Sequence, residues 1–281
     1  MKTTSTRRPA FTLVEMLVVI LIMSILVTLV TLGVTRAMRF ASEVGTKTEM
    51  AQIEQALGVA ALDLGRVPYI PSILYLWDSP GNAQTDIAAE GNATVKSFKQ
   101  MSLRMLKQMF PNWTSATWLS NSPPPNNPLN ATQAYVFILG GRQGNEGFHA
   151  TNGDPWATGG KRKGPYFNFK QERLNNYTFK DYWNNDTFLV VYSSQMVASG
   201  STPTSGETPS GYPSRQTSKP TSLYMPKGYQ IFAAGKDGRW GAGGGGAGQY
   251  GQAAFNGLLT GDGEDDQCNF SESPLGKPIN D

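Results

Sequence analysis

The first residue that suggests chemistry is Glu15, an acidic side chain at the start of a run that is otherwise apolar. The 20 positions that follow, residues 16–35, contain no charged residue. As a helix this run would be about 30 Å long, which matches the hydrocarbon core of a bilayer. A carboxylate costs about 2.5–3.5 kcal/mol at the centre of a membrane helix and less near its end. We therefore expect Glu15 to be functional and to require a cationic partner.

A second group of acids lies near the C-terminus. Four acidic residues fall within five positions: Asp262, Glu264, Asp265 and Asp266. Carboxylates this close repel one another unless a cation lies among them, and Ca²⁺ binds 6–8 oxygens from carboxylates and backbone carbonyls. The spacing is not that of an EF-hand loop. The cluster therefore suggests either a calcium site or a solvated acidic turn.

The histidine and cysteine counts limit the remaining chemistry. His149 is the only histidine and Cys268 the only cysteine, which excludes an intramolecular disulfide and a four-cysteine zinc site. A Ser-His-Asp triad would depend on His149, which we expect in a solvated glycine-rich loop. We find no nucleophile–base pair and expect no enzymatic activity. The net charge of +3 does not require a nucleic acid or an anionic surface as partner.

The apolar run has simpler interpretations. A secretory signal has an apolar stretch of about 7–15 residues followed by a small-residue cleavage site. This run is longer and is followed by Arg36 and Arg39. A plain single-pass anchor remains an alternative, but it gives no reason for Glu15. Basic residues before the run favour a cytoplasmic N-terminus, with the bulk of the chain across the membrane; they are Lys2, Arg7 and Arg8.

The helix should continue beyond the apolar run. Apolar or small residues recur at helical spacing and form one stripe, with Glu49, Gln52 and Gln55 off it; the stripe is Thr46, Met50, Ile53, Leu57, Ala60 and Leu64. Gly65 suits the left-handed residue that closes a helix, and Pro68 prevents continuation.

The remaining chain predicts few regular elements. Residues 66–94 are rich in turn signals, and Lys96–Phe110 predicts a second helix, with Lys96, Lys99, Arg104 and Lys107 facing away from the core. Three segments predict strands of a small antiparallel sheet: Ala134–Leu139, Thr187–Tyr192 and Tyr229–Ala233. Segments 140–186 and 199–222 are expected to be long loops. The fold class is therefore α+β.

The segment Phe11–Met16, with its basic leader and uncharged run, resembles the N-terminus of type IV pilins and type II secretion pseudopilins. The resemblance implies cleavage between Ala10 and Phe11 by a prepilin peptidase, followed by methylation of Phe11. Ala10 stands where that family usually has glycine. Glu15 becomes the fifth mature residue, which attracts the Phe11 amine of a neighbouring subunit during assembly.

Two C-terminal segments, 229–238 and 261–270, look like the end of the major type II pseudopilin, whose loop binds calcium. The resemblance implies Asp237, Asp265 and Asp266 as calcium ligands. A nearly all-glycine insertion, 241–251, separates the two halves. A flexible spacer of this kind adds little to the cost of closing the site.

The resulting prediction is a pilin-like fold made of a leader (1–10), a transmembrane helix (11–35), its amphipathic continuation (36–65) and a globular domain (66–281). The implied function is a pseudopilin-like structural subunit of a type II secretion or type IV pilus-like filament. Its expected partners are the prepilin peptidase, homologous pilin subunits, the inner membrane and a secretion or pilus assembly platform. The globular domain would be periplasmic.

Two alternatives remain open. One is a minor pilin that binds a ligand or DNA through Lys161–Lys163 and nearby aromatics, although we expect Tyr166, Phe167 and Phe169 to anchor the core or loops. The other is a membrane-anchored enzyme that uses the acidic cluster and a metal.

Overall fold

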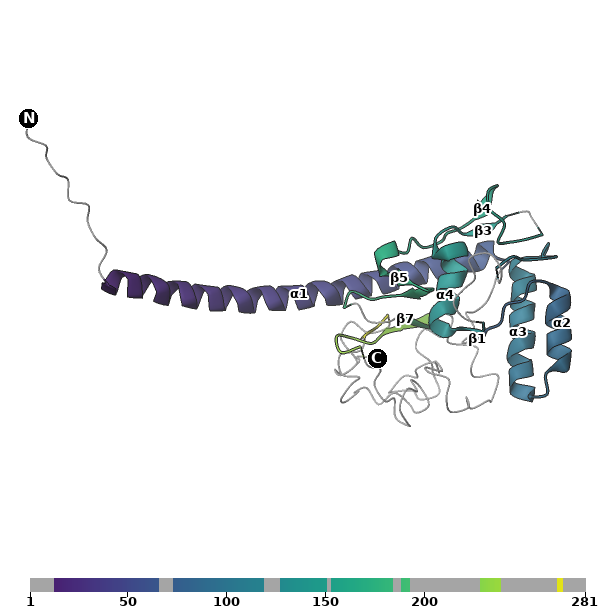
Figure 1. Ribbon diagram of the computed structural model, residues 1–281, viewed down its shortest axis with the longest axis horizontal. Coiled ribbons are helices and arrows are strands. Elements are labelled where there is room, and N and C mark those ends of the chain that lie inside the picture. The colour runs from purple at the N-terminus through teal and green to yellow at the C-terminus, as the bar shows by residue number, and fades with distance from the viewer. Residues whose placement is uncertain are drawn as a thin grey trace, which may run out of the picture. The chain divides into compact units, whose positions relative to one another are not determined.

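The computed structural model describes residues 13–65, 73–118, 127–150, 153–183, 188–192, 228–238 and 267–269. The chain forms two compact units, an N-terminal unit (Met1–Gly45) and a C-terminal unit (Thr46–Asp281). In the described residues, a long helix is followed by short helices and small antiparallel sheets (Figure 1). The fold class is α+β, as the sequence predicts.

Helix α1 (Leu13–Asp63) is unbroken, as expected from the absence of proline. Within the C-terminal unit, every residue of the predicted stripe from Thr46 to Leu64 is buried. The helix ends before Gly65, which has a φ of +81° and lies against α3. A Cβ at Gly65 would lie 2.4 Å from the carbonyl oxygen of Gln108, so only glycine fits this turn.

Two helices form a hairpin after α1. Helix α2 (Pro80–Ala89) and helix α3 (Ala93–Met109) lie side by side (Figure 1). Helix α2 was not predicted from the sequence, because a Ser-Pro pair is typical of turns as well as of helix starts. Here Ser79 caps the helix by accepting a hydrogen bond from the Asn82 amide at 3.2 Å, and Pro80 occupies the first turn, where no backbone N–H is needed.

The predicted orientation of Lys99 is wrong. Its side chain is buried between α2 and α3, and the ammonium lies 2.9 Å from Asp86 and 3.0 Å from Glu90. The Nε1–H of Trp77 also donates to Asp86, at 2.9 Å. Helical periodicity alone could not place the Lys99 side chain, because its partners belong to α2, which was not predicted.

The ion-pair cluster of Lys99, Asp86 and Glu90 should make the stability of the fold depend on pH. The pKa of Asp86 is lowered, mainly by the hydrogen bond from Lys99, and that of Glu90 is lowered by the Asn92 amide and then by Lys99. The pKa of Lys99 is raised, mainly by its hydrogen bond to Asp86. Lowered carboxyl pKa values stabilise the fold at neutral pH, and this stabilisation is lost as the pH falls through the folded-state values. The raised pKa of Lys99 stabilises the folded state fully below pH 10.5, and this stabilisation is lost as the pH rises through the folded-state pKa.

We therefore expect Lys99→Met to lower the free energy of unfolding at pH 7 by about 1.5 kcal/mol, a low figure for bonds to a charged group because Asp86 is partly exposed. The variant should also lose less stability than the wild type when the pH is lowered from 7 to 3. Urea titrations at both pH values measure this, with the exposed Lys107→Met as control. Equal acid sensitivity in Lys99→Met and the wild type would contradict the assignment.

The predicted strand Ala134–Leu139 is a helix, α4 (Ala131–Gly140). The helix starts with a capping box. The backbone N–H of Gln133 donates to the side-chain oxygen of Asn130 at 3.0 Å, and the backbone N–H of Asn130 donates to the side-chain oxygen of Gln133 at 3.3 Å. All residues from Gln133 to Gly140 are buried. A segment buried on every side shows neither helical nor strand periodicity, which explains why the short apolar run was misassigned.

Within the described residues, the strands form four small antiparallel sheets. The largest has the order β7-β8-β9, with Ala233 of β8 opposite Gln267 of β9. It confirms the predicted strands near 187–192 and 229–233. The strands are β1 (Ile73–Leu74) with β2 (Leu129–Asn130), β3 (Phe148–His149) with β4 (Arg162–Lys163), β5 (Leu174–Asn175) with β6 (Thr178–Phe179), and β7 (Phe188–Tyr192), β8 (Tyr229–Ala233) and β9 (Gln267–Cys268).

An aromatic cluster forms the centre of the core. Trp118, Phe137 and Trp156 pack on one another with ring centroids 5.6–6.2 Å apart, and all three are buried. The indole N–H of Trp118 donates to the carbonyl of Trp77 at 2.9 Å, which satisfies a buried donor. This core packs α3 and α4 against the C-terminal part of α1, from Met50 onward.

Candidate functional site: the N-terminal helix and the C-terminal turn

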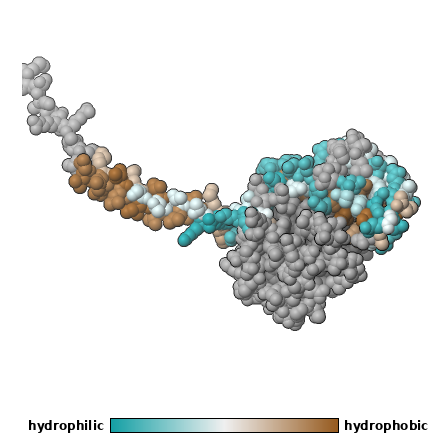
Figure 2. All heavy atoms as spheres, turned by 60° about the horizontal axis from the view of Figure 1, so that its bottom comes forward, coloured by the Kyte–Doolittle hydropathy of each residue, from teal (hydrophilic) through white to brown (hydrophobic). Residues whose placement is uncertain are grey.

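The described part of the N-terminal unit is an apolar helix without a covering layer. An 18-residue window of α1 has a mean hydropathy of 2.9 and no buried residue. Figure 2 shows hydrophobic residues around the visible side of this helix. The helix is long and apolar enough to cross a membrane. Such a surface is stable only against lipid or against other apolar protein, because water would be in contact with every turn.

The hydroxyl groups of this helix are compatible with lipid. Four hydroxyls donate to backbone carbonyls three or four residues earlier, at 2.7–3.0 Å. A polar group in hydrocarbon must find its hydrogen bond within the protein. The four residues are Ser24, Thr28, Thr31 and Thr35.

Glu15 is exposed in the first turn of α1. A carboxylate is favoured there, because the free N–H groups and the helix dipole give that end a partial positive charge. Ala10 and Phe11 lie outside the described residues. Their cleavage, their methylation and the pairing of Phe11 with Glu15 therefore remain predictions.

Of the three proposed calcium ligands, the structure describes only Asp237. It is exposed in the turn that follows β8, where the Gly238 amide donates to the Ala234 carbonyl at 3.1 Å. Asp265 and Asp266 lie outside the described residues. In the described part of the chain, no group of three or more His, Cys, Asp or Glu side chains could hold a metal. The strand register pairs Gln267 of β9 with Ala233 of β8. Gln267 directly follows Asp266, and Ala233 lies four residues before Asp237.

Asn269 has a structural role that the sequence analysis did not assign. Its side-chain amide donates to Glu54 of α1 at 3.0 Å and to the Tyr229 carbonyl at 2.9 Å, and its side-chain oxygen accepts from the Ile231 amide at 3.0 Å. It therefore fastens β8 and the end of β9 to α1. Cys268 beside it is buried.

The basic run at 161–163 is largely part of the fold. Arg162 donates to the carbonyls of Glu146, Gly147 and Ala157, and Lys163 donates to the Asp63 carbonyl. His149 pairs with Arg162 across β3 and β4 and is half-buried, so the expectation of a solvated loop was wrong. Phe169 is buried, as expected of a core anchor. These contacts leave only Lys161 exposed in the run, which weakens the case for a DNA-binding patch.

Glu49 was expected off the buried stripe, yet it is buried. Both of its carboxylate oxygens accept from the guanidinium of Arg173 at 2.6 Å. Arg173 also stacks on the rings of Phe179 and Tyr182 at 4.6 and 4.4 Å. The signal was present in the sequence, because Glu49 lies four residues before Ile53 and therefore borders the stripe. Its partner, 124 positions away, could not be read from spacing.

Comparison with known proteins supports the N-terminal assignment. Residues 6–31 match the family described as the prokaryotic N-terminal methylation motif, which is the signature of type IV pilins and pseudopilins. No curated protein and no solved structure matches the chain. The chain thus carries the motif that prepilin peptidases process, on an apolar helix that suits a single-pass membrane anchor.

Proposed function

We propose that this protein is a pseudopilin-like structural subunit of a bacterial envelope filament, of the type II secretion or type IV pilus kind. The observation that carries the proposal is the methylation motif at 6–31 on an apolar helix with no protein cover in its most apolar window. After cleavage at Ala10, the apolar helix is held in the inner membrane. During assembly it exchanges lipid for the helices of neighbouring subunits.

The register between subunits comes from one charge pair. The methylated Phe11 amine of one subunit meets Glu15 of the next, in a low-dielectric setting where the attraction offsets part of the desolvation cost. The basic leader keeps the N-terminus cytoplasmic. The C-terminal unit is then periplasmic.

The intact mass of the protein extracted from its own membranes tests this proposal. We expect the loss of residues 1–10 and the gain of one methyl group. Ala10→Gly should be cut at least as completely, because glycine is the usual residue before the cut in the resembled family. A retained Met1, or a cut elsewhere, would contradict the proposal.

Calcium binding at the C-terminal turn is a separate part of the proposal. The β8–β9 register and the position of Asp237 support it, because the chain enters β9 directly after Asp265 and Asp266. Three carboxylates and nearby carbonyls suit Ca²⁺.

We expect millimolar Ca²⁺ to raise the unfolding midpoint of the wild type and to have no such effect on Asp237→Asn. The control is Glu172→Gln, which changes an exposed acid elsewhere in the C-terminal unit and should respond to Ca²⁺ as the wild type does. If Ca²⁺ stabilises Asp237→Asn as much as the wild type, Asp237 is not a ligand.

A further inference from the structure

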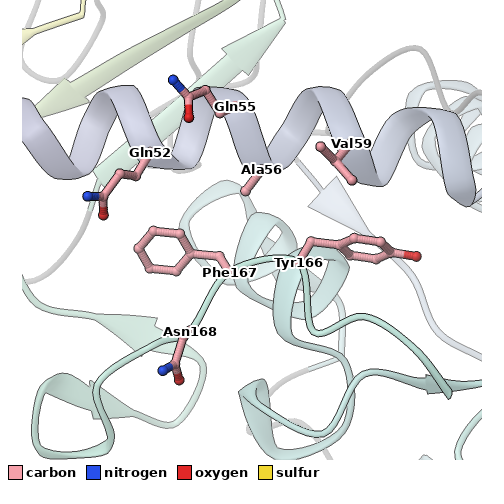
Figure 3. Close-up of a pocket in the computed structure, with 7 residues that line it drawn as sticks. All are labelled: Gln52, Gln55, Ala56, Val59, Tyr166, Phe167 and Asn168. Atoms are coloured by element: carbon pink, nitrogen blue, oxygen red, sulfur yellow. The ribbon is translucent and has the colours of Figure 1, made fainter.

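A groove lies between α1 and the segment 166–168 of the C-terminal unit (Figure 3). Its volume is about 360 Å³, at the lower end of the range of about 300–1,000 Å³ for small-molecule sites. None of the described residues that line the groove is charged. They are Gln52, Gln55, Ala56, Val59, Tyr166, Phe167 and Asn168.

The aromatic side of the groove is held firmly in place. The ring of Phe167 packs on Phe169 and Phe179, with centroids 4.7 and 5.9 Å apart. The hydroxyl of Tyr166 donates to the Asp63 carboxylate at 2.5 Å. Across from these rings, Ala56 and Val59 of α1 supply an apolar wall. The groove therefore offers a fixed aromatic surface that needs no rearrangement before binding.

Three carboxamides surround this apolar surface. Gln52 and Gln55 extend from α1, and Asn168 lies on the other side of Phe167 (Figure 3). All three residues are exposed, and their side chains form no hydrogen bond with the described part of the chain. Each carboxamide carries both donors and an acceptor. Hydroxyl groups also donate and accept, so the three amides match a ligand rich in hydroxyls.

The same residues favour a neutral, hydroxyl-bearing ligand over charged or purely apolar ligands. A charged ligand would lose water without gaining an opposite charge from the lining residues, and a purely apolar ligand would bury amides without hydrogen bonds. A sugar ring combines an apolar C–H face with a rim of hydroxyls. We propose that this groove binds a neutral saccharide, with one ring stacked on Phe167 and its hydroxyls bonded to Gln52, Gln55 and Asn168. This inference goes beyond the proposed function and does not depend on it.

Binding should be measured by calorimetry on the full chain in phospholipid nanodiscs, because detergents with sugar headgroups would compete. The probes are chitotriose, cellotriose and maltotriose, with trigalacturonate as the charged comparison. We expect at least one neutral trisaccharide to bind with a stoichiometry of one. Gln52→Ala and Asn168→Ala should each weaken its Kd about tenfold, the size expected for a lost hydrogen bond. Gln84→Ala, which removes an exposed glutamine on α2, should leave the Kd unchanged.

Three results would overturn the inference. They are the absence of binding by all three neutral probes, equally tight binding of trigalacturonate, and an unchanged Kd in both groove variants. The unfolding midpoint of each variant should equal that of the wild type, since neither side chain is bonded within the described residues. Gln55→Ala serves as a replacement for any variant that fails this check.

Discussion

Glu15→Ala is expected to abolish filament assembly while leaving membrane insertion and cleavage intact. Insertion should persist, because removing a carboxylate makes the apolar segment easier to place in lipid. Assembly should fail, because the methylated amine of Phe11 would then be buried between subunits without an opposite charge. Removing one partner of a buried pair typically costs about 3–5 kcal/mol. We expect the yield of sheared filaments, counted by electron microscopy, to fall at least tenfold.

The matched control for this experiment is Glu43→Ala, which removes an acid from the same helix outside the apolar run. It should assemble normally. The membrane fraction and the intact mass of Glu15→Ala should equal those of the wild type, which separates assembly from insertion and processing. Normal filaments from Glu15→Ala would refute the proposed charge pair, even if cleavage before Phe11 were established.

The second large effect is expected from Glu49→Ala in the C-terminal unit. The substitution leaves the partly buried Arg173 guanidinium beside α1 without its carboxylate. The free energy of unfolding should fall by about 3 kcal/mol, the low end for a buried pair. Arg173 would keep its bonds to the Lys180 carbonyl and its contacts with Phe179 and Tyr182. All six tryptophans lie beyond residue 45. Tryptophan fluorescence during urea unfolding therefore reports on this unit alone.

Two further variants test whether the stability loss comes from the unpaired Arg173 charge or from lost packing contacts. Glu172→Ala removes an exposed acid next to Arg173 and should change the free energy of unfolding by less than about 0.5 kcal/mol. The double substitution Glu49→Leu with Arg173→Met should recover most of the lost stability, because no buried charge is left unpaired. A loss below about 1 kcal/mol in Glu49→Ala would show that the pair is not buried in solution.

The sequence predicted the elements whose signals are local. The long helix could be predicted because an uncharged run is followed by one stripe of apolar residues without proline. The strands near 187–192 and 229–233 could be predicted from their β-branched and aromatic residues. Helix α4 could not, since a segment buried on all sides has no periodic pattern. Helix α2 was hidden by turn residues that also serve as its cap.

The candidate sites also divide into those proposed from the sequence and those found only in the structure. The cleavage site, Glu15 and the acids at 237, 265 and 266 were proposed from sequence, and of these the structure describes only Glu15 and Asp237. The Glu49–Arg173 pair, the Asn269 contacts and the groove beside Phe167 came only from the structure. Each of them joins residues that lie more than 100 positions apart in the chain.

The sequence by itself determined that the protein carries an apolar helix with one acid at its start, because hydrophobicity and charge depend on composition within a single segment. Only the tertiary structure decided which polar residues of the C-terminal unit are buried and paired and which face a groove. The physical reason is that desolvation and hydrogen bonding depend on which distant segments pack together. Lys99 and Gln52 both looked like surface residues in the sequence, and packing buried one against α2 and left the other open beside Phe167.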